Sequence, residues 1–153
     1  MSKYKKLSHV IYKCDYHIVW VPKYRLRILK GVIKTLVERD IRSLCEWKSC
    51  EVQELNVQED HVHLLVSVPP KVSISKLMGI LKGKIAIKLF KTYPKLKEKP
   101  YWGNHFWARG YFVSTVGLDE EMIRKYVKYQ ENPDEFKFPK KVTDYAAKAE
   151  EEK

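Results

Sequence analysis

Alternating hydrophobic and polar residues predict a β-strand in the stretch from Glu59 to Pro70 (EDHVHLLVSVPP), which two prolines end. Successive side chains of a strand point to opposite faces of the sheet. The face that suits a hydrophobic core carries Val62, Leu64, Val66 and Val68. His61 and His63 therefore lie side by side on the opposite face, with their Cα atoms roughly 6.5–7 Å apart.

Three further stretches have the composition of strands. They are residues 12–22 (YKCDYHIVWVP), 51–57 (EVQELNV) and 105–116 (HFWARGYFVSTV). In the last stretch, the set that suits the core is Phe106, Ala108, Gly110 and Phe112. The alternate set combines an arginine with aromatic rings, which suits stacking on bases and pairing with phosphates: His105, Trp107, Arg109 and Tyr111. The alternative is an ordinary half-exposed strand face.

Hydrophobic residues recur at helical spacing in two long stretches. The first spans about Ile28 to Trp47 and has an apolar face formed by Val32, Leu36, Val37, Ile41 and Leu44. The second follows Ser73, a predicted N-cap, and is expected to bury Ile74, Leu77, Met78, Leu81, Ile85 and Leu89. Gly79 and Gly83 interrupt this helix at a cost of about 1 kcal/mol each relative to alanine. Either they permit close packing against the sheet, or they only weaken the helix.

A third helix is predicted over residues 119–131, where Asp119 can cap its start. The element order is therefore βαββαβ followed by a helix. This order is typical of a ferredoxin-like α+β fold, in which both long helices cover one face of an antiparallel sheet. We expect a single domain over residues 1–131, opened by a loose basic arm at 1–6, and a charged tail over residues 132–153.

The net charge of the chain suggests a partner. A net charge of +11 in 153 residues favours a polyanion, and nucleic acid above all. The alternative is a charged surface that only keeps the protein soluble. Residues 71–99 hold nine lysines and one acid, and four of these lysines share one helix face: Lys84, Lys88, Lys91 and Lys95. The predicted DNA-binding residues are Lys84, Lys88, Lys91, Arg109, Lys23 and Arg25.

Cysteine usage and hydropathy predict a cytoplasmic protein with no membrane partner. The cysteines, Cys14, Cys45 and Cys50, are odd in number and form no CxxC pattern, so we expect free thiols in a reducing compartment. The chain contains neither a signal peptide nor an apolar run near 18 residues long.

The paired histidines are candidate ligands for one divalent cation, provided that a third group arrives from elsewhere. Such a cation would polarise a phosphodiester and neutralise charge that develops on its oxygens. Tyr126 and Gln130 lie four residues apart on the predicted third helix and are the candidate nucleophile and third ligand. The plainer interpretations are a polar sheet face or subunit contact for the histidines, a packed aromatic for Tyr126 and a solvent-facing Gln130.

Several short motifs, in the same order along the chain, carry a resemblance to a known family. They are residues 16–25 (YHIVWVPKYR), 60–65 (DHVHLL), 75–77 (SKL), 81–84 (LKGK), 111–117 (YFVSTVG), and 123–127 (IRKYV) with Gln130. The chain resembles the single-tyrosine HUH transposases, specifically the TnpA type of the insertion-sequence 200/605 group. The resemblance covers the chain from about Tyr16 to Gln130.

The resemblance implies a role for each site residue. His61 and His63 match the histidines that hold Mg²⁺ or Mn²⁺, and Gln130 matches a further metal ligand. Tyr126 matches the nucleophile that forms a 5′-phosphotyrosine with single-stranded DNA. The neighbouring Tyr129 departs from the pattern and is a second candidate nucleophile.

The resemblance also implies partners and a reaction. Enzymes of this kind act as homodimers, recognise small hairpins near the ends of the element, and excise and reinsert it as single strands. Two other functions stay open. One is a ferredoxin-like module that binds RNA or DNA without chemistry, and the other is a metal-dependent phosphodiesterase that uses water as its nucleophile. The sequence leaves open which metal binds and whether Tyr126 acts in its own subunit or in a partner.

Overall fold

The computed structural model describes residues 4–98, 105–117 and 121. These residues belong to two compact units, one formed by residues 14–115 and the other by residues 1–13 with 116–153. The predicted helix 119–131 and tail 132–153 lie outside the described residues, apart from position 121.

A four-stranded antiparallel sheet forms the larger unit, in the order β4-β5-β3-β6. Its strands are β3 (Asp15–Trp20), β4 (Glu51–Gln58), β5 (His61–Ser67) and β6 (Phe112–Thr115). A β-bulge between Val52 and Glu54 lets Gln53 donate a hydrogen bond to the buried carboxylate of Asp15, at 3.1 Å.

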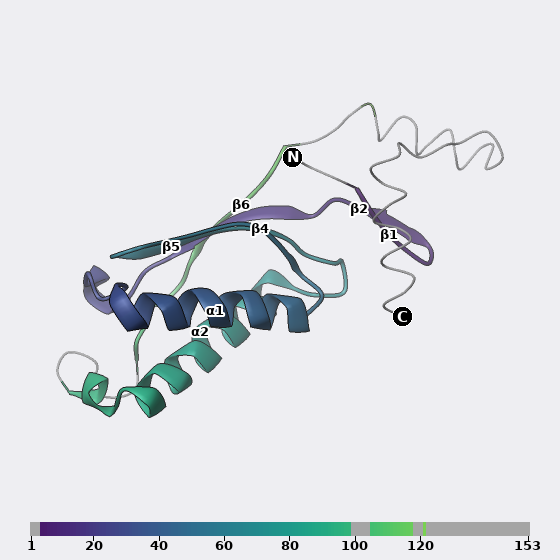
Figure 1. Cartoon of the computed structure of the whole chain (residues 1–153). Helices are drawn as coiled ribbons and strands as arrows, with labels where there is room; N and C mark the ends of the chain where they lie inside the picture. The colour runs from purple at the N-terminus through teal and green to yellow at the C-terminus, as the bar shows by residue number, and fades with distance from the viewer. Residues whose placement is uncertain (1–3, 99–104, 118–120, 122–153) are drawn as a thin grey trace. The chain divides into compact units, whose positions relative to one another are not determined.

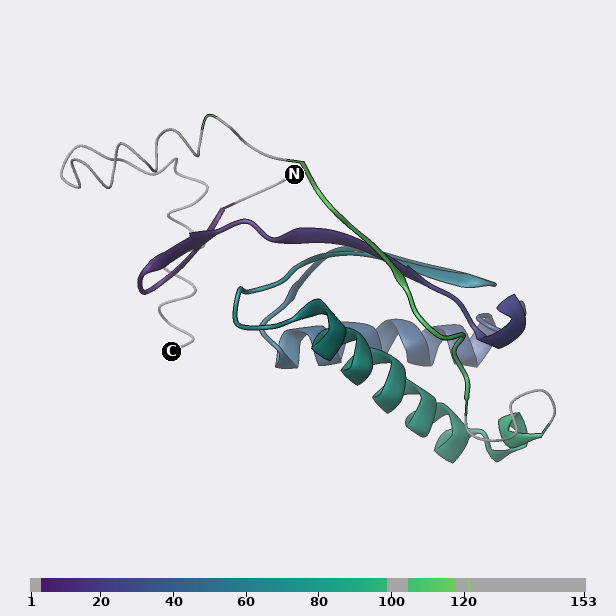
Figure 2. The same cartoon turned by 180° about the vertical axis from the view of Figure 1, so that it is seen from behind.

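Two long helices, α1 (Gly31–Trp47) and α2 (Ile74–Thr92), cover one face of this sheet, as Figures 1 and 2 show from opposite sides. The order of elements in this unit is β3-α1-β4-β5-α2-β6, which confirms the predicted ferredoxin-like arrangement. Short 3-10 helices follow β3 (η1, Lys23–Arg25) and α2 (η2, Pro94–Lys97). No helix in the described part of the chain has both the length and the hydropathy that a membrane crossing requires.

The core lies between the sheet and the helices. Its sheet side includes Ile18, Trp20, Val62, Leu64 and Val66, and its helix side includes Leu36, Val37, Ile41, Leu77, Leu81, Ile85 and Leu89. The alternation predicted for β5 is confirmed, because its valine and leucine face is buried. One predicted core residue, Val32, is instead 63% exposed, since it lies in the first turn of α1.

The helix α2 begins at the predicted cap, but its glycines do not serve close packing. The Ser73 hydroxyl accepts a hydrogen bond from the Lys76 backbone N–H at 3.1 Å, so the predicted N-cap is confirmed. Gly79 and Gly83 are exposed, and a Cβ at either position would meet no atom within 4 Å. Close packing against the sheet therefore does not explain them.

The predicted fourth strand is too long. Only Phe112–Thr115 forms the strand β6, because Gly110 has a φ of +82° and the chain turns there. The Lys82 ammonium donates hydrogen bonds to the carbonyls of Ala108 and Gly110, at 2.8 and 3.0 Å, in place of strand partners. The predicted alternation fails with the strand: Trp107 is buried and Phe112 is 61% exposed.

The amino-terminal prediction is also wrong in part. The chain forms an antiparallel hairpin from β1 (Lys5–Leu7) and β2 (Val10–Tyr12) where a loose arm over residues 1–6 was expected. The stretch 12–22 accordingly holds the end of one strand and the whole of another, β3. Each of these two strands has only three residues, which is too short for composition alone to signal a strand.

Candidate functional site

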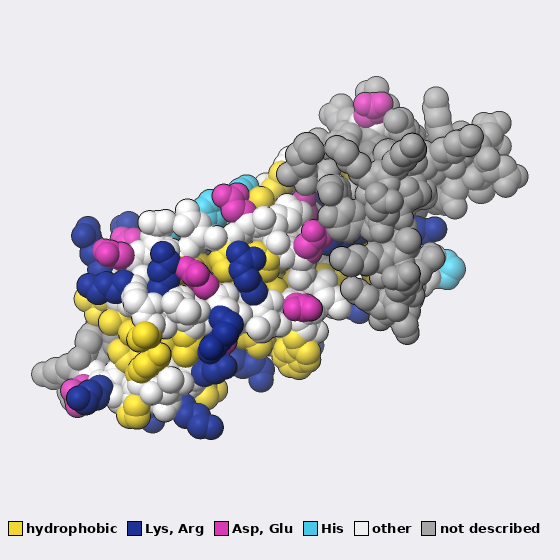
Figure 3. All heavy atoms as spheres, in the orientation of Figure 1, with side chains coloured by type: hydrophobic (Ala, Val, Ile, Leu, Met, Phe, Trp, Pro, Cys, Tyr) yellow, Lys and Arg dark blue, Asp and Glu magenta, His cyan; other side chains and the backbone are white. Residues whose placement is uncertain are grey.

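Three histidines gather on the sheet face opposite the helices. His61 and His63 lie on β5, on the face that the core does not use, as predicted. On the neighbouring strand β3, Val19 pairs with His63 and His17 pairs with Leu65, so His17 lies diagonally across from His63. Figure 3 shows histidine side chains on the sheet side of this unit, while many lysine and arginine side chains lie over the helices.

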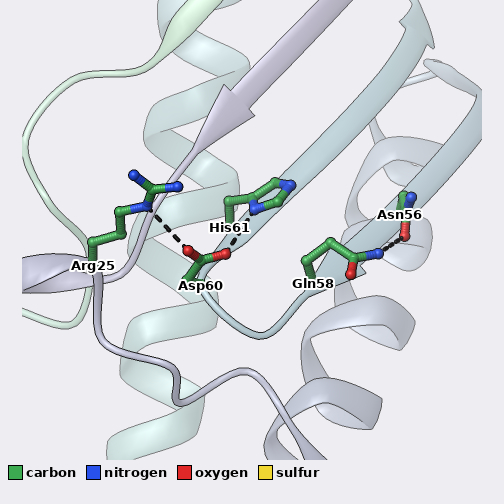
Figure 4. A network of polar contacts seen from close by, with 5 residues as sticks. All are labelled: Arg25, Asn56, Gln58, Asp60 and His61. Atoms are coloured by element: carbon green, nitrogen blue, oxygen red, sulfur yellow. Dashed lines mark hydrogen bonds and ion pairs between the residues drawn. The ribbon is translucent and has the colours of Figure 1, made fainter.

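A carboxylate fixes one of these rings. Asp60 Oδ1 lies 2.8 Å from His61 Nδ1, and Asp60 Oδ2 lies 3.1 Å from Arg25 Nε (Figure 4). The hydrogen bond to His61 lowers the pKa of Asp60, and the charge of Arg25 lowers it further, against the opposing effect of desolvation. A carboxylate only accepts hydrogen bonds, so His61 Nδ1 carries the proton and Nε2 presents its lone pair when the ring is neutral.

The second histidine contacts a third ring. His63 Nε2 lies 3.1 Å from His17 Nδ1, and the two ring centroids are 5.4 Å apart. One nitrogen of this pair donates and the other accepts. A cation can therefore bind His63 at Nδ1 with this hydrogen bond kept, or at Nε2 in its place.

Polar amides border the histidines on the edge strand β4. Asn56 pairs with His63 and Gln58 pairs with His61. The Gln58 amide nitrogen donates to the Asn56 amide oxygen at 2.6 Å, and both side chains are exposed (Figure 4). These two amides thus add exposed oxygen and nitrogen atoms beside the half-buried histidines.

The histidines fit a divalent cation as two of its ligands. Imidazole nitrogens with an oxygen donor suit several divalent ions, and a carboxylate behind a ligand histidine is a frequent companion of such sites. Within the described residues, no group of three His, Cys, Asp or Glu side chains could hold a metal ion. A third ligand would have to be a group of another kind, and the predicted Gln130, like Tyr126, lies outside the described residues.

The loop that brings Arg25 to this site has a strained backbone. Tyr24 and Arg25 adopt φ values of +59° and +52°, in the left-handed region that costs non-glycine residues of order 1–3 kcal/mol each. Backbone hydrogen bonds hold the loop on both sides: Lys23 N–H donates to Phe106 O at 2.8 Å, and Leu29 N–H donates to Glu59 O at 2.9 Å.

The predicted DNA-binding residues do not all gather at the histidines. Lys84, Lys88 and Lys91 are exposed on α2, on the other side of the sheet. Lys88 Nζ forms an ion pair with Asp40 at 3.4 Å, and Lys84 Nζ lies 5.5 Å from the Trp47 ring centroid. Arg109 is exposed in the loop before β6. Lys23 lies 5.4 Å from the Tyr24 ring centroid, so only Arg25 reaches the histidine site through a contact.

Sequence reasoning missed two residues of the site, His17 and Asp60. The alternation of β3 places His17 opposite the buried Ile18, and antiparallel pairing with β5 would have suggested its neighbour His63. Asp60 precedes the strand, and nothing in its spacing signals that its side chain turns back onto His61.

Comparisons with known proteins identify the family. Residues 10–130 match the family model described as "Transposase IS200 like". The transposase for insertion sequence element IS200 of Salmonella typhimurium is 42% identical over 130 residues, which cover 85% of either chain. The ISDra2 transposase TnpA of Deinococcus radiodurans is 35% identical over 127 residues, covering 82% of this chain and 90% of that relative.

Solved structures agree with the fold. A crystal structure of a putative transposase from Deinococcus radiodurans superposes with a TM-score of 0.66 at 31% identity, covering 83% of this chain and 95% of the other. The REP-associated tyrosine transposase bound to a REP hairpin shares the fold at a TM-score of 0.53 and 11% identity, covering 81% and 70%. The chain therefore belongs to the family of IS200-like transposases.

Proposed function

We propose that this transposase cleaves and rejoins single-stranded DNA at hairpin-marked element ends, through a covalent 5′-phosphotyrosine on Tyr126. The observation that carries the proposal is the sheet face opposite the core, where His61 and His63 lie side by side and Asp60 holds His61 with Nε2 available. A binding module without chemistry has no need of a histidine held in this way.

His61, His63 and Gln130 are the residues proposed to hold Mg²⁺ or Mn²⁺. When bound, the ion would polarise the scissile phosphodiester and offset the negative charge that develops on its oxygens. The protein's own contribution is the fixed orientation of His61 on the half-buried sheet face opposite the core.

The covalent step is a transesterification. The Tyr126 oxygen forms a bond to phosphorus as the bond from phosphorus to the 3′-oxygen breaks. The phenol, with an ordinary pKa near 10, gives up its proton, and the departing 3′-oxygen takes one up. One phosphate ester replaces another, so the reverse reaction can reseal DNA without ATP.

The proposed partners are single-stranded DNA and a second copy of the chain. A structural relative of the same fold is bound to a REP hairpin, which makes a hairpin a reasonable substrate to test first. The net charge of +11 supports a polyanionic partner, with Lys84, Lys88, Lys91, Arg109, Lys23 and Arg25 as candidate contacts. In a homodimer, the helix that carries Tyr126 can serve the site of its own subunit or that of its partner.

The test is to incubate wild type and Tyr126→Phe with labelled hairpin DNA and Mn²⁺, and to separate the products under denaturing conditions. We expect a protein–DNA adduct with wild type only, and equal hairpin affinity for both proteins. Cleavage that continues in Tyr126→Phe without an adduct would identify a phosphodiesterase. Binding without cleavage in wild type, across a hairpin library, would favour the non-catalytic module.

A further inference from the structure

Arg25 and His61 are joined through the two oxygens of a single carboxylate. Asp60 Oδ2 accepts from Arg25 Nε at 3.1 Å, and Asp60 Oδ1 accepts from His61 Nδ1 at 2.8 Å (Figure 4). We propose that Arg25 is a positioning residue, which acts through Asp60 to set the orientation and tautomer of His61. The proposal deepens the proposed function, on which it rests for the role of His61 as a metal ligand.

The link from Asp60 to His61 determines which ring nitrogen can bind a cation. A carboxylate has no proton to donate, so the hydrogen bond requires a proton on Nδ1. The lone pair of the neutral ring is then on Nε2. Without Asp60, a neutral imidazole can carry its proton on either nitrogen, and the fraction with Nε2 available falls.

The link from Arg25 to Asp60 holds the carboxylate in place. Asp60 lies in the turn between β4 and β5, and its side chain is 24% exposed. An aspartate in such a turn can rotate away from its neighbour unless both of its oxygens have partners. Arg25 is 70% exposed, and an ion pair this exposed adds little to folding stability. Its effect is therefore better understood as geometric.

The backbone of the Arg25 loop supports this assignment. Two consecutive non-glycine residues, Tyr24 and Arg25, adopt left-handed φ values, and backbone hydrogen bonds to Phe106 and Glu59 anchor the loop. A loop that only displayed cations toward DNA would need no such constraint. Residues held in strained conformations are typical of functional sites, where the surrounding structure maintains them.

The same arginine can connect the DNA to the metal site. The link to Asp60 uses Nε, and the guanidinium has two further nitrogens that suit a phosphate oxygen. A phosphate that binds these nitrogens would hold Arg25 in the position from which it orients His61. The Arg25 side chain would then both contact the DNA and maintain the orientation of His61.

Two measurements without DNA test the proposal. The first is the tautomer of His61 from ¹⁵N NMR of the metal-free protein at a pH where the ring is neutral. We expect wild type to carry the proton on Nδ1, and Arg25→Ala and Asp60→Ala to shift His61 toward the Nε2–H form. The second is Mn²⁺ affinity from electron paramagnetic resonance titration. Asp60→Asn should weaken binding about 10–100-fold, and Arg25→Ala about 3–10-fold.

The controls separate charge from geometry. Arg27→Ala removes an exposed arginine two residues away, and Glu59→Gln removes the neighbouring carboxylate, so both should match wild type. Arg25→Lys keeps the positive charge for DNA but lacks the Nε–H group, so we expect it to resemble Arg25→Ala in tautomer and Mn²⁺ affinity. Circular dichroism verifies that each variant is folded.

The outcomes are distinct. An unchanged His61 tautomer and an unchanged Mn²⁺ affinity in folded Arg25→Ala would overturn the proposal and assign Arg25 to DNA contact alone. If wild type binds no Mn²⁺, the proposed function loses its metal site. The tautomer measurement still decides whether Arg25 orients His61 in that case.

Discussion

At the scale of single residues, the site depends on how each histidine is held. His61 is fixed by Asp60, whereas His63 shares a hydrogen bond with another imidazole, that of His17. The two candidate ligands therefore lie in different surroundings, although the sequence places them in equivalent positions of one strand. Substitution of either histidine should nevertheless have the same effect on DNA cleavage, because the proposed cation needs both rings as ligands.

We predict that His61→Ala and His63→Ala each abolish DNA cleavage while hairpin affinity stays within about threefold of wild type, since affinity should come from lysines and arginines. Gel-based cleavage and fluorescence anisotropy on the same samples measure the two quantities. Asn56→Ala, a neighbouring exposed position on β4, serves as a control for general damage to the sheet face. Equal loss of binding and cleavage would make the histidines structural.

At the scale of elements, strand faces and helix faces could be predicted where one side of the element is buried. The alternation of β5 and the apolar stripe of α2 both follow from burial against the same core. The stretch before β6 could not be predicted, because Gly110 turns the backbone there. The Gly110 carbonyl accepts a hydrogen bond from Lys82, a residue 28 positions earlier in the chain. The histidine pair could be predicted from the alternation of its strand. Its link to Arg25 through Asp60 could not, because it depends on a loop conformation, and no periodic pattern of residues predicts a loop conformation.

The glycines of α2 give a stability prediction. Gly83→Ala should raise the free energy of unfolding by about 1 kcal/mol, because alanine is the better helix former and its Cβ would enter open space. Urea unfolding measures the change. Gly31→Ala is the matched control and should destabilise, since Gly31 has a φ of +59°. A destabilising Gly83→Ala would restore the interpretation that this glycine serves close packing.

The packing of α1 predicts a loss of stability in alkali. Burial, with a further effect of Cys50, raises the pKa of the Cys45 thiol to about 12 from an ordinary 9.0. The unfolded chain therefore releases this proton first, so the stabilisation is fully present below pH 9 and is lost as the pH rises toward 12. Its steepest slope is about 1.4 kcal/mol per pH unit.

Urea unfolding between pH 8.5 and 10.5 checks this prediction against Cys45→Ala. The variant should be less stable near neutral pH, because it leaves a small cavity in the core, but its stability should fall less steeply with pH. Parallel curves for the two proteins would mean that Cys45 does not contribute to the alkaline loss.

At the scale of the whole molecule, the order of elements was enough to predict the ferredoxin-like fold, because short connections and antiparallel pairing leave few alternatives. Sequence order did not reveal how the charges are distributed. The lysines of α2 lie on the helix side of the sheet and the histidines on the other side. DNA that contacts both would have to reach around the sheet edge or across a dimer.

Salt dependence tests whether the α2 lysines bind DNA. For single strands, the slope of log K against log salt is about −0.7 per phosphate contact, so Lys91→Gln should reduce its magnitude by about 0.7. Lys88→Gln should change it less, because Asp40 already pairs with that ammonium at 3.4 Å. Fluorescence anisotropy over about 50–300 mM NaCl gives the slope for each variant. Unchanged slopes in both variants would leave these lysines as a solvated surface.

The most direct test of the proposed function is to identify the residue that becomes joined to DNA. Wild type is incubated with hairpin DNA and Mn²⁺, digested with trypsin and nuclease, and analysed by mass spectrometry. We expect a nucleotide on Tyr126, and none when His61→Ala is used. A nucleotide on Tyr129, or cleaved DNA with no modified tyrosine in the protein, would contradict it.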